Sequence, residues 1–378
     1  MPSNYFTSGI DLVPQLVSRD YFPSAVLPNG LFSWGINSNG NLGVSDTTQR
    51  SSPIRVGSLT TWNNIACGSN HTVATKTDGS LWVCGYNNNG QLGLSDTTQR
   101  TSPVQVGSLL TWNKVSCGSY FTAATQTDGS LWTWGENQYG QLGSGTITYR
   151  SSPVRVGLLT TWNNIACCGT QFIATQNNGS LWSWGRGTFG GLGLGDTTHR
   201  SSPVQIGSLT TWKNIACGYR HALATQTNGS LWSWGESGWG QLGSSNETPR
   251  SSPVQVGSLL TWNTMVGGGY HTVATKTDGS LWTWGYNNDG QLGIGDITYR
   301  NSPVQVGSLL TWNKVACGYN HIFATKTDGS LWAWGLNSFG RLGLGDVTKR
   351  SSPVQVGSLL TWNKVACGYA HTVATMKS

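Results

Sequence analysis

A repeat of fixed length runs through the whole sequence. The motif Leu-aromatic-x-Trp-Gly begins at residue 31 and returns every fifty residues without insertion or deletion, with "LWVCG" as its one variant. Its seven copies start at Leu31, Leu81, Leu131, Leu181, Leu231, Leu281 and Leu331. Periods of this length are typical of β-propellers or solenoids. The chain therefore folds as an array of seven similar units.

Each repeat contains four segments with strand character. In the second repeat these segments are "PIRV" from Pro53, "NIACG" from Asn64, "HTVATKT" from His71 and "SLWVCG" from Ser80. Asp78-Gly79 separates the last two, and Asp-Gly or Asn-Gly stands at the same place in five further repeats. These dipeptides favour two-residue hairpin loops in which both central residues have positive φ. We predict such a hairpin in six repeats.

The two ends of the chain each hold an incomplete repeat. The last repeat stops at "HTVATMKS", before its Leu-Trp-x-Trp-Gly strand, whereas "LFSWG" at residues 31–35 has no complete set of partners. A solenoid covers its ends with atypical repeats, but a closed ring pairs them and leaves no sheet edge exposed. We therefore predict an all-β fold, a seven-bladed β-propeller of four-stranded antiparallel blades. Residues 31–35 should complete the C-terminal blade, which we expect to take its other three strands from the C-terminal end.

This interpretation divides the chain into two parts. Residues 31–378 form one propeller domain, and residues 1–30 form an N-terminal arm that is the one non-repetitive part of the sequence. The arm contains enough apolar residues to dock on the ring or on another subunit, so we expect it to serve tethering or self-assembly. It lacks the basic region and apolar core of a signal peptide, and no segment is long enough to span a membrane. A cytoplasmic location or incorporation into a virion or another assembly is expected.

The segment "CGYNHIFATKTDGSLWAWGLNSFGRLGLGDVTKRSSPVQV", read from Cys317, resembles the repeat of the regulator of chromosome condensation (RCC1) family. The shared elements are Gly-x-x-His, the Asp-Gly hairpin, Trp-Gly, Gly-x-Leu-Gly and the Pro before the outer strand. The resemblance covers residues 31–378 and implies a seven-bladed propeller.

What the resemblance implies about function is broad. The eukaryotic namesake is a nucleotide exchange factor for a small nuclear GTPase and also binds chromatin. Here the fixed spacing leaves no room for an inserted hairpin, and residues 1–30 hold one basic residue, Arg19. The plant UV-B receptor of the family uses Gly-Trp-Arg-His-Thr, whose nearest match is "GYRHA" at Gly218, so photoreception is not indicated. Bacterial relatives include an inhibitor of β-lactamases, and others resemble binding or structural parts of bacteria and their viruses. The near-identical repeats of this sequence fit this last group better than the exchange factor or the photoreceptor.

The net charge of +7 equals the number of arginines at one repeat position. They are Arg50, Arg100, Arg150, Arg200, Arg250, Arg300 and Arg350. Because they are dispersed one per repeat, a nucleic-acid-binding patch is not expected. Five have an aspartate four residues earlier, which indicates an ion pair or carbonyl contacts within the loop. The alternative is a cationic ring that attracts an acidic partner.

Histidine also recurs at one repeat position. The five copies are His71, His221, His271, His321 and His371. Phe121 and Gln171 take this place in two repeats, which disfavours a metal site. We expect hydrogen-bonded histidines that hold the blades.

Six cysteines share another repeat position, with Gly267 as the exception. We expect buried, reduced thiols, because facing sheets stand about 10 Å apart and a disulfide needs Cα atoms within about 7 Å. The adjacent pair Cys167-Cys168 is a poor disulfide, and no zinc-ligand spacing occurs.

The repeats differ most in the loop that follows each Trp-Gly. Variable loops on a recurrent framework are how a scaffold presents a binding surface, and aromatic side chains are frequent interface anchors. The candidate partner-binding residues are Tyr86, Tyr139, Arg186, Phe189, Trp239, Tyr286 and Phe339. Tyr139, Phe189 and Trp239 should form an arc over three consecutive blades. The alternative is that these aromatic rings cover the adjoining Gly-x-Leu-Gly turn.

No catalytic constellation or phosphate-binding loop is recognisable, and we predict a non-enzymatic, cofactor-free propeller. Its predicted function is to bind a protein partner through variable loops on one face, or to act as a structural part, such as a surface or appendage component of a bacterium or bacterial virus. The first alternative is a guanine-nucleotide exchange or regulatory factor for a small GTPase. A more distant one is an inhibitor that caps an enzyme with one propeller face.

Overall fold

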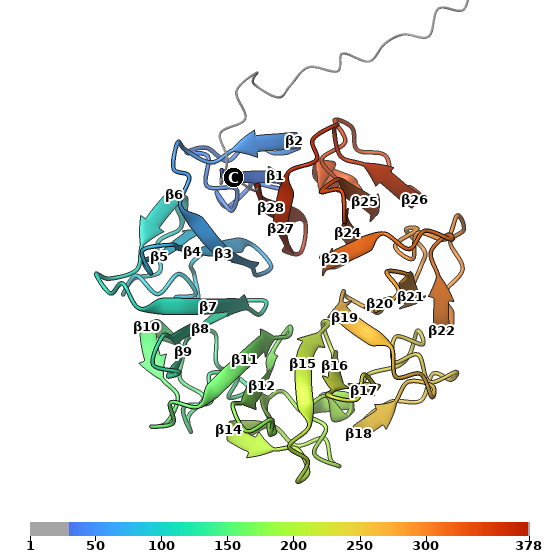
Figure 1. Ribbon diagram of the computed structural model, residues 1–378. Coiled ribbons are helices and arrows are strands. Elements are labelled where there is room, and N and C mark those ends of the chain that lie inside the picture. Colours follow the sequence, from blue (N-terminus) through green and yellow to red (C-terminus); the bar gives the residue numbers. More distant parts are fainter. Residues whose placement is uncertain (1–29, 377–378) are drawn as a thin grey trace, which may run out of the picture.

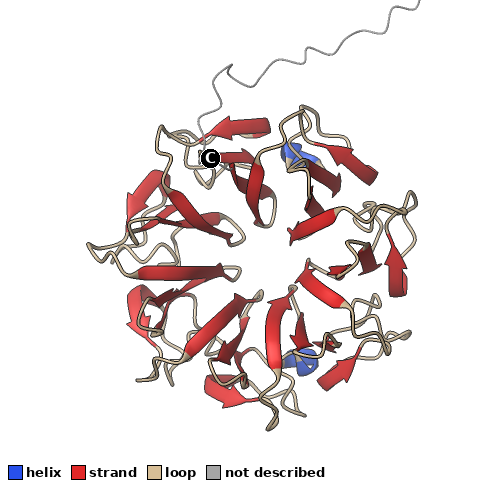
Figure 2. Ribbon diagram, in the orientation of Figure 1, coloured by secondary structure: helices blue, strands red, loops and turns tan. Residues whose placement is uncertain are grey.

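The computed structural model describes residues 30–376, and in this part the chain forms seven four-stranded antiparallel sheets arranged as blades around a central channel (Figure 1). Two short 3₁₀ turns, η1 (Thr188–Gly190) and η2 (Ser338–Gly340), are the helical segments of this part, and all else is strand or loop (Figure 2). The prediction of an all-β, seven-bladed propeller is confirmed. No helix in residues 30–376 is long and apolar enough to cross a membrane.

The two strands of each blade nearest the channel form a hairpin. The innermost strands are β3 (Trp62–Cys67), β7 (Trp112–Cys117), β11 (Trp162–Cys167), β15 (Trp212–Cys217), β19 (Trp262–Gly267), β23 (Trp312–Cys317) and β27 (Trp362–Cys367). The second strands are β4 (His71–Lys76), β8 (Phe121–Gln126), β12 (Gln171–Gln176), β16 (His221–Gln226), β20 (His271–Lys276), β24 (His321–Lys326) and β28 (His371–Met376).

The remaining two strands of each blade lie toward the rim (Figure 1). The third strands carry the Leu-aromatic motif: β1 (Leu31–Gly35), β5 (Leu81–Gly85), β9 (Leu131–Gly135), β13 (Leu181–Gly185), β17 (Leu231–Gly235), β21 (Leu281–Gly285) and β25 (Leu331–Gly335). The outermost are β2 (Arg50–Arg55), β6 (Arg100–Gln105), β10 (Arg150–Arg155), β14 (Arg200–Gln205), β18 (Arg250–Gln255), β22 (Arg300–Gln305) and β26 (Arg350–Gln355).

The ring closes where the two ends of the chain meet. Strand β1 pairs with β28, with Leu31 opposite Thr375 and Gly35 opposite His371, as predicted. The closing sheet has the order β2-β1-β28-β27, so it takes two strands from each end. The expectation of three C-terminal strands and one N-terminal strand was wrong. Each outermost strand follows its third strand in the chain, so β26 pairs with β25 in the preceding blade and β2 completes the last one.

The Asp-Gly hairpins are present, but the loop differs from the predicted type. Gly79 has a φ of +82°, whereas Asp78 does not take positive φ. The Gly79 N–H donates to the Lys76 carbonyl at 3.0 Å, which places Thr77 and Asp78 at the centre of the turn and the glycine after it. This is the three-residue loop, a turn followed by a left-handed residue. The Asp78 carboxylate accepts hydrogen bonds from the backbone and hydroxyl of Ser80, and these lower the pKa of Asp78.

The third strand of each blade packs on both faces. In β9, Leu131 and Thr133 point to one side and Trp134 to the other, and all three are fully buried. The Trp134 indole N–H donates to the Gln91 carbonyl of the preceding blade at 2.9 Å. The same bond between neighbouring blades recurs at five other tryptophans: Trp34, Trp184, Trp234, Trp284 and Trp334. Cys84 takes the seventh place.

Alternating strand direction divides the loops between two faces of the disc. We call the "loop face" the one formed by the short loops between innermost and second strands, residues 68–70 in the first full blade, and by the long loops between third and outermost strands, residues 86–99. The "hairpin face" carries residues 77–80 and 106–111 and their equivalents. The predicted docking arm, apart from Gly30, lies outside the described residues.

Candidate functional site

Four tyrosines gather on the loop face at the mouth of the channel. They belong to the short loops of successive blades. The ring centroid of Tyr319 lies 5.6 Å from that of Tyr219, 5.8 Å from that of Tyr270 and 4.6 Å from that of Tyr369. Burial, a hydrogen bond and the proximity of other tyrosines raise the pKa of Tyr319. Sequence reasoning missed this cluster, although tyrosine recurs at the variable positions of Gly-x-x-His.

The predicted aromatic residues lie further out, on the long loops of the same face. Phe189, Trp239 and Phe339 are 42, 40 and 43% exposed, so each presents a large apolar surface to solvent. Phe189 and Phe339 have φ angles of 59° and 65°, a conformation that is rare for bulky residues. Tyr139 is half-buried and packs against the His199 ring at a centroid distance of 5.1 Å.

The other predicted partner-binding residues, Tyr86, Arg186 and Tyr286, each lie against an aromatic ring of the loop face. The Tyr286 ring lies 4.9 Å from that of Trp239, and the Tyr86 ring lies 6.0 Å from that of Tyr120. The Arg186 guanidinium lies over the Tyr139 ring at 4.8 Å. The structure thus connects Tyr139 with Arg186 and Trp239 with Tyr286, while Phe339 on η2 lies against Arg341 of its own loop at 5.8 Å.

Two glutamates stand at equivalent positions of these loops, each directly after the Trp-Gly of the third strand. Glu136 is 6% exposed, and its Oε1 accepts a hydrogen bond from the Gln138 amide at 2.8 Å. Burial raises the pKa of Glu136. Glu236 lies 3.9 Å from the Arg220 guanidinium, and burial raises its pKa while Arg220 and Arg186 oppose this shift.

A hollow of about 420 Å³ joins the two levels of the loop face. Its lining includes Tyr120, Glu136, Gln138, Tyr139, Arg186, Tyr219, Tyr319 and Tyr369. The hollow therefore combines aromatic walls with one buried carboxylate and one guanidinium. Such a mixture of apolar surface and a few polar groups is characteristic of a recognition site.

The repeated histidines lie inside the ring and not in this hollow. All five are fully buried, and burial lowers the pKa of His71, His221, His271 and His371 to about 3. The Nε2 of His71 lies 3.0 Å from the Thr122 hydroxyl of the next blade, and this hydroxyl donates to the Gln91 carbonyl. The histidine Nε2–H is therefore the donor to the hydroxyl.

The same bond joins His221 to Thr272, His321 to Thr372 and His371 to Thr72. His271 faces Ile322 instead, and both of its ring nitrogens lack a partner in the described part of the chain. Within residues 30–376, no three His, Cys, Asp or Glu side chains are grouped as metal ligands.

The repeated arginines lie at the rim. Ion pairs of 2.5–2.6 Å join Arg50 to Asp46, Arg100 to Asp96, Arg200 to Asp196, Arg300 to Asp296 and Arg350 to Asp346. A hydrogen bond from the Thr98 backbone, together with Arg100, lowers the pKa of Asp96. Carbonyl contacts within the loop are also present, such as that of Arg100 with Thr98 at 2.6 Å. Arg150 and Arg250 form no ion pair with a described residue.

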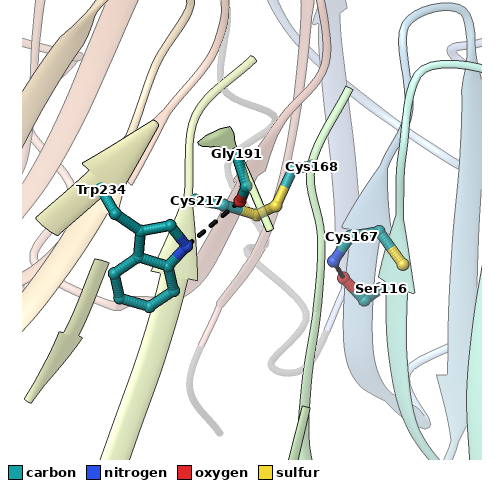
Figure 3. Close-up of a disulfide and its surroundings, with 6 residues drawn as sticks. All are labelled: Ser116, Cys167, Cys168, Gly191, Cys217 and Trp234. Atoms are coloured by element: carbon teal, nitrogen blue, oxygen red, sulfur yellow. Dashed lines mark hydrogen bonds between the residues drawn. A yellow bond between two sulfur atoms is a disulfide. The ribbon is translucent and has the colours of Figure 1, made fainter. Parts of the chain in front are cut away.

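The expectation that all cysteines are reduced was wrong at one position. Cys168 and Cys217 form a disulfide between neighbouring blades, with their Cα atoms 5.3 Å apart (Figure 3). The prediction assumed the spacing between parallel stacked sheets. Neighbouring blades instead converge toward the channel, so their inner ends lie closer together than parallel layers do. The remaining six cysteines of the chain are free thiols, and burial raises the pKa of Cys84 to about 12.

Known proteins share this architecture. The RCC1-like domain model matches residues 11–266 and 160–378. The chain belongs to the RCC1-like domain family. Human WBSCR16 is 24% identical over 93% of this chain and 100% of its own, with a TM-score of 0.84.

Two yeast structures show the same fold. RCC1 (Prp20), in a complex with Kap60, is 20% identical over 93% of this chain and 90% of its own, with a TM-score of 0.82. Prp20p from Saccharomyces cerevisiae, described with its binding properties to Gsp1p and histones, is 20% identical over 94% and 92%, with a TM-score of 0.81. At these identities the likeness establishes the propeller of this RCC1-like protein, and its function must be argued from its own surface.

Proposed function

We propose that this RCC1-like propeller is a non-enzymatic module that binds a protein partner through the loop face. The observation that carries the proposal is the concentration of exposed aromatic and charged side chains on the loops where the repeats differ. Trp239 and Phe189 stay about 40% exposed although burying such rings is favourable, which is expected of residues that become covered in a complex. Its yeast relatives are described with protein partners, namely Kap60, Gsp1p and histones, which supports this class of function.

The test compares two faces of one protein. The double variant Tyr139→Ala, Trp239→Ala removes two rings from the loop face, and the control Leu110→Ala, Leu260→Ala removes two exposed side chains from the hairpin face. Partners captured by the wild-type protein and identified by mass spectrometry should be lost from the first variant and retained by the second. Equal capture by both variants would contradict binding through the loop face.

A second candidate is regulation of a small GTPase, favoured by membership of the RCC1-like family and by the binding of Gsp1p described for Prp20p. The experiment that separates the candidates is a nucleotide-release assay with a panel of small GTPases. Acceleration of release that the loop-face double variant abolishes would support regulation. Absence of acceleration across the panel would leave the binding module as the proposed function.

A role as a surface or appendage component of a bacterium or bacterial virus is a finer form of the proposal. The near-identical repeats with polar loops support it, as does an N-terminal segment that could tether the ring to an assembly. Deletion of residues 1–20 should then abolish incorporation into the assembly while the isolated ring still folds, as measured by circular dichroism. Unchanged incorporation would eliminate tethering by this segment.

A further inference from the structure

Glu136 is a buried carboxylate without a full set of partners. The residue is only 6% exposed, and of its two carboxylate oxygens only Oε1 is hydrogen-bonded, to Gln138. Its Oε2 is enclosed and has no hydrogen-bond partner in the described part of the chain. A buried acceptor in this state is costly, and such groups in native proteins call for an explanation.

The equivalent residue two repeats later shows what is missing. The Oε2 of Glu236 also lacks a hydrogen-bond partner in the described part of the chain, but the Arg220 guanidinium lies 3.9 Å from it. The residue that corresponds to Arg220 beside Glu136 is Tyr120, which has no charge. Glu136 therefore occupies the same kind of site as Glu236 with the internal cation removed.

The space next to Glu136 is open to the loop face and lined with aromatic rings. Tyr120 and Tyr139 lie in the wall of the hollow of about 420 Å³, together with three tyrosines from the channel mouth. Aromatic faces attract a cation, and more strongly where water is excluded. Arg186 also lines this hollow, but its guanidinium lies over the Tyr139 ring, and it opposes the rise that burial causes in the pKa of Glu236.

We propose that this hollow receives an arginine or lysine side chain of the partner protein, whose charged end pairs with Glu136. The proposal rests on the proposed function, since it names the chemistry that the loop face recognises. The aliphatic part of the incoming side chain would pass between the tyrosine rings, and Gln138, which is exposed, can move to admit it. The exposed rings of Phe189 and Trp239 lie on the loops of the next two blades and would contact the rest of the partner segment.

The test uses the full-length protein and a phage-displayed library of random peptides. Wild-type protein should enrich peptides that carry a lysine or arginine at one fixed position, and replacing that residue by alanine in a synthetic peptide should weaken binding about tenfold or more. Glu136→Gln should lose the preference for a basic residue. The matched control is Glu247→Gln, the same change at an exposed glutamate of the same face.

A second variant keeps the test valid if Glu136→Gln alters the local fold. Tyr120→Arg supplies the internal cation that Glu236 already has, so it should raise the melting temperature and abolish selection of basic peptides. Circular dichroism establishes that both variants fold.

The outcomes distinguish the two levels of the argument. Enriched peptides without a basic preference, or the same preference in wild-type protein and Glu136→Gln, would overturn the inference and leave the proposed function standing. Failure of the wild-type protein to enrich any peptide would also overturn the inference. The proposed function would fall only if, in addition, the loop-face and hairpin-face double variants captured partners equally.

Discussion

Two junctions between neighbouring blades perform the same task with different chemistry. Where β27 and β28 meet the first full blade, His371 donates to the Thr72 hydroxyl at 3.1 Å, and this hydroxyl donates to the Asn41 carbonyl. Where β11 and β12 meet the blade of β15, a disulfide joins Cys168 to Cys217. The first junction relies on a buried hydrogen-bond chain and the second on a covalent bond.

The departures at the second junction depend on one another. At the regular position, a Cβ on Gly68 would overlap the His71 ring, so histidine there requires glycine. Gln171 replaces the histidine in the third repeat, which leaves room for Cys168. A Cβ at position 191 would in turn overlap the Gln171 amide, and Gly191 stands there in place of the usual polar residue. A residue of such a junction can therefore change only if the residues that it contacts change as well.

Two irregular junctions flank the β11–β14 blade, and the blade before it carries Glu136 and Tyr139 of the candidate site. On the other side of the β11–β14 blade, Phe121 packs against Phe172 in place of a histidine–threonine bond. This blade also bears Arg186 and Phe189 on the loop face. The core thus departs from its regular pattern on both sides of the β11–β14 blade. Trp239 and Phe339, in contrast, lie on blades that keep the regular histidine–threonine bond.

The largest expected effect is acid unfolding of the regular junctions. Burial lowers the pKa of four histidines from 6.5 to about 3, so the unfolded chain binds protons more readily than the folded one. Stability is therefore fully present above pH 6.5 and is lost as the pH falls toward 3, by about 1.4 kcal/mol per pH unit for each histidine. Urea unfolding measured from pH 7 to pH 4 checks this. A flat profile above pH 5 would contradict it, and His371→Gln should reduce the slope by one proton.

The disulfide is expected to contribute less than these histidines together. Cys217→Ser opens a loop with a sequence separation of 49 residues and should lower the free energy of unfolding by about 2–4 kcal/mol. The matched control is Cys317→Ser, which changes a free thiol at the same repeat position. A reducing agent should reproduce the loss in the wild-type protein and have no effect on Cys217→Ser. Equal stability of the two serine variants would show that the covalent bond is dispensable.

A smaller effect should separate two histidines of the same repeat position. His371→Ala removes both packing and the bond to Thr72, whereas His271→Ala removes packing alone because His271 faces Ile322. His371→Ala should therefore be the more destabilising by about 1 kcal/mol, the usual net contribution of one hydrogen bond. Chemical denaturation of both variants measures the difference, and the reverse order would remove the energetic basis for the regular junction.

The smallest effect concerns the irregular sector and has the opposite sign. Burial raises the pKa of Glu136, so its ionisation destabilises the free protein as the pH rises through that pKa. Glu136→Gln should then raise the free energy of unfolding by about 1 kcal/mol at pH 7, with no gain at pH 3.5. Glu236→Gln should gain less because Arg220 compensates its charge. Destabilisation by Glu136→Gln at pH 7 would indicate a structural carboxylate instead of one held for a partner.

The sequence by itself determined the ring. Seven copies of Leu-aromatic-x-Trp-Gly at a fixed spacing specify seven equivalent units, and the incomplete repeats at the two ends specify closure through residues 31–35. Periodicity is sufficient here because each unit contacts mainly its neighbours, so one local pattern describes every interface. The same reasoning placed Phe189 and Trp239 in a variable loop of known position.

Only the tertiary structure decided which residues from different blades meet. The tyrosines of the channel mouth are about one repeat length apart in the sequence, and nothing local records that Tyr319 packs between Tyr219 and Tyr369. The pairing of Cys168 with Cys217 likewise depends on how closely the blades converge at the channel. Sequence patterns report the environment of one residue along its own strand, whereas distances between blades follow from the curvature of the closed ring.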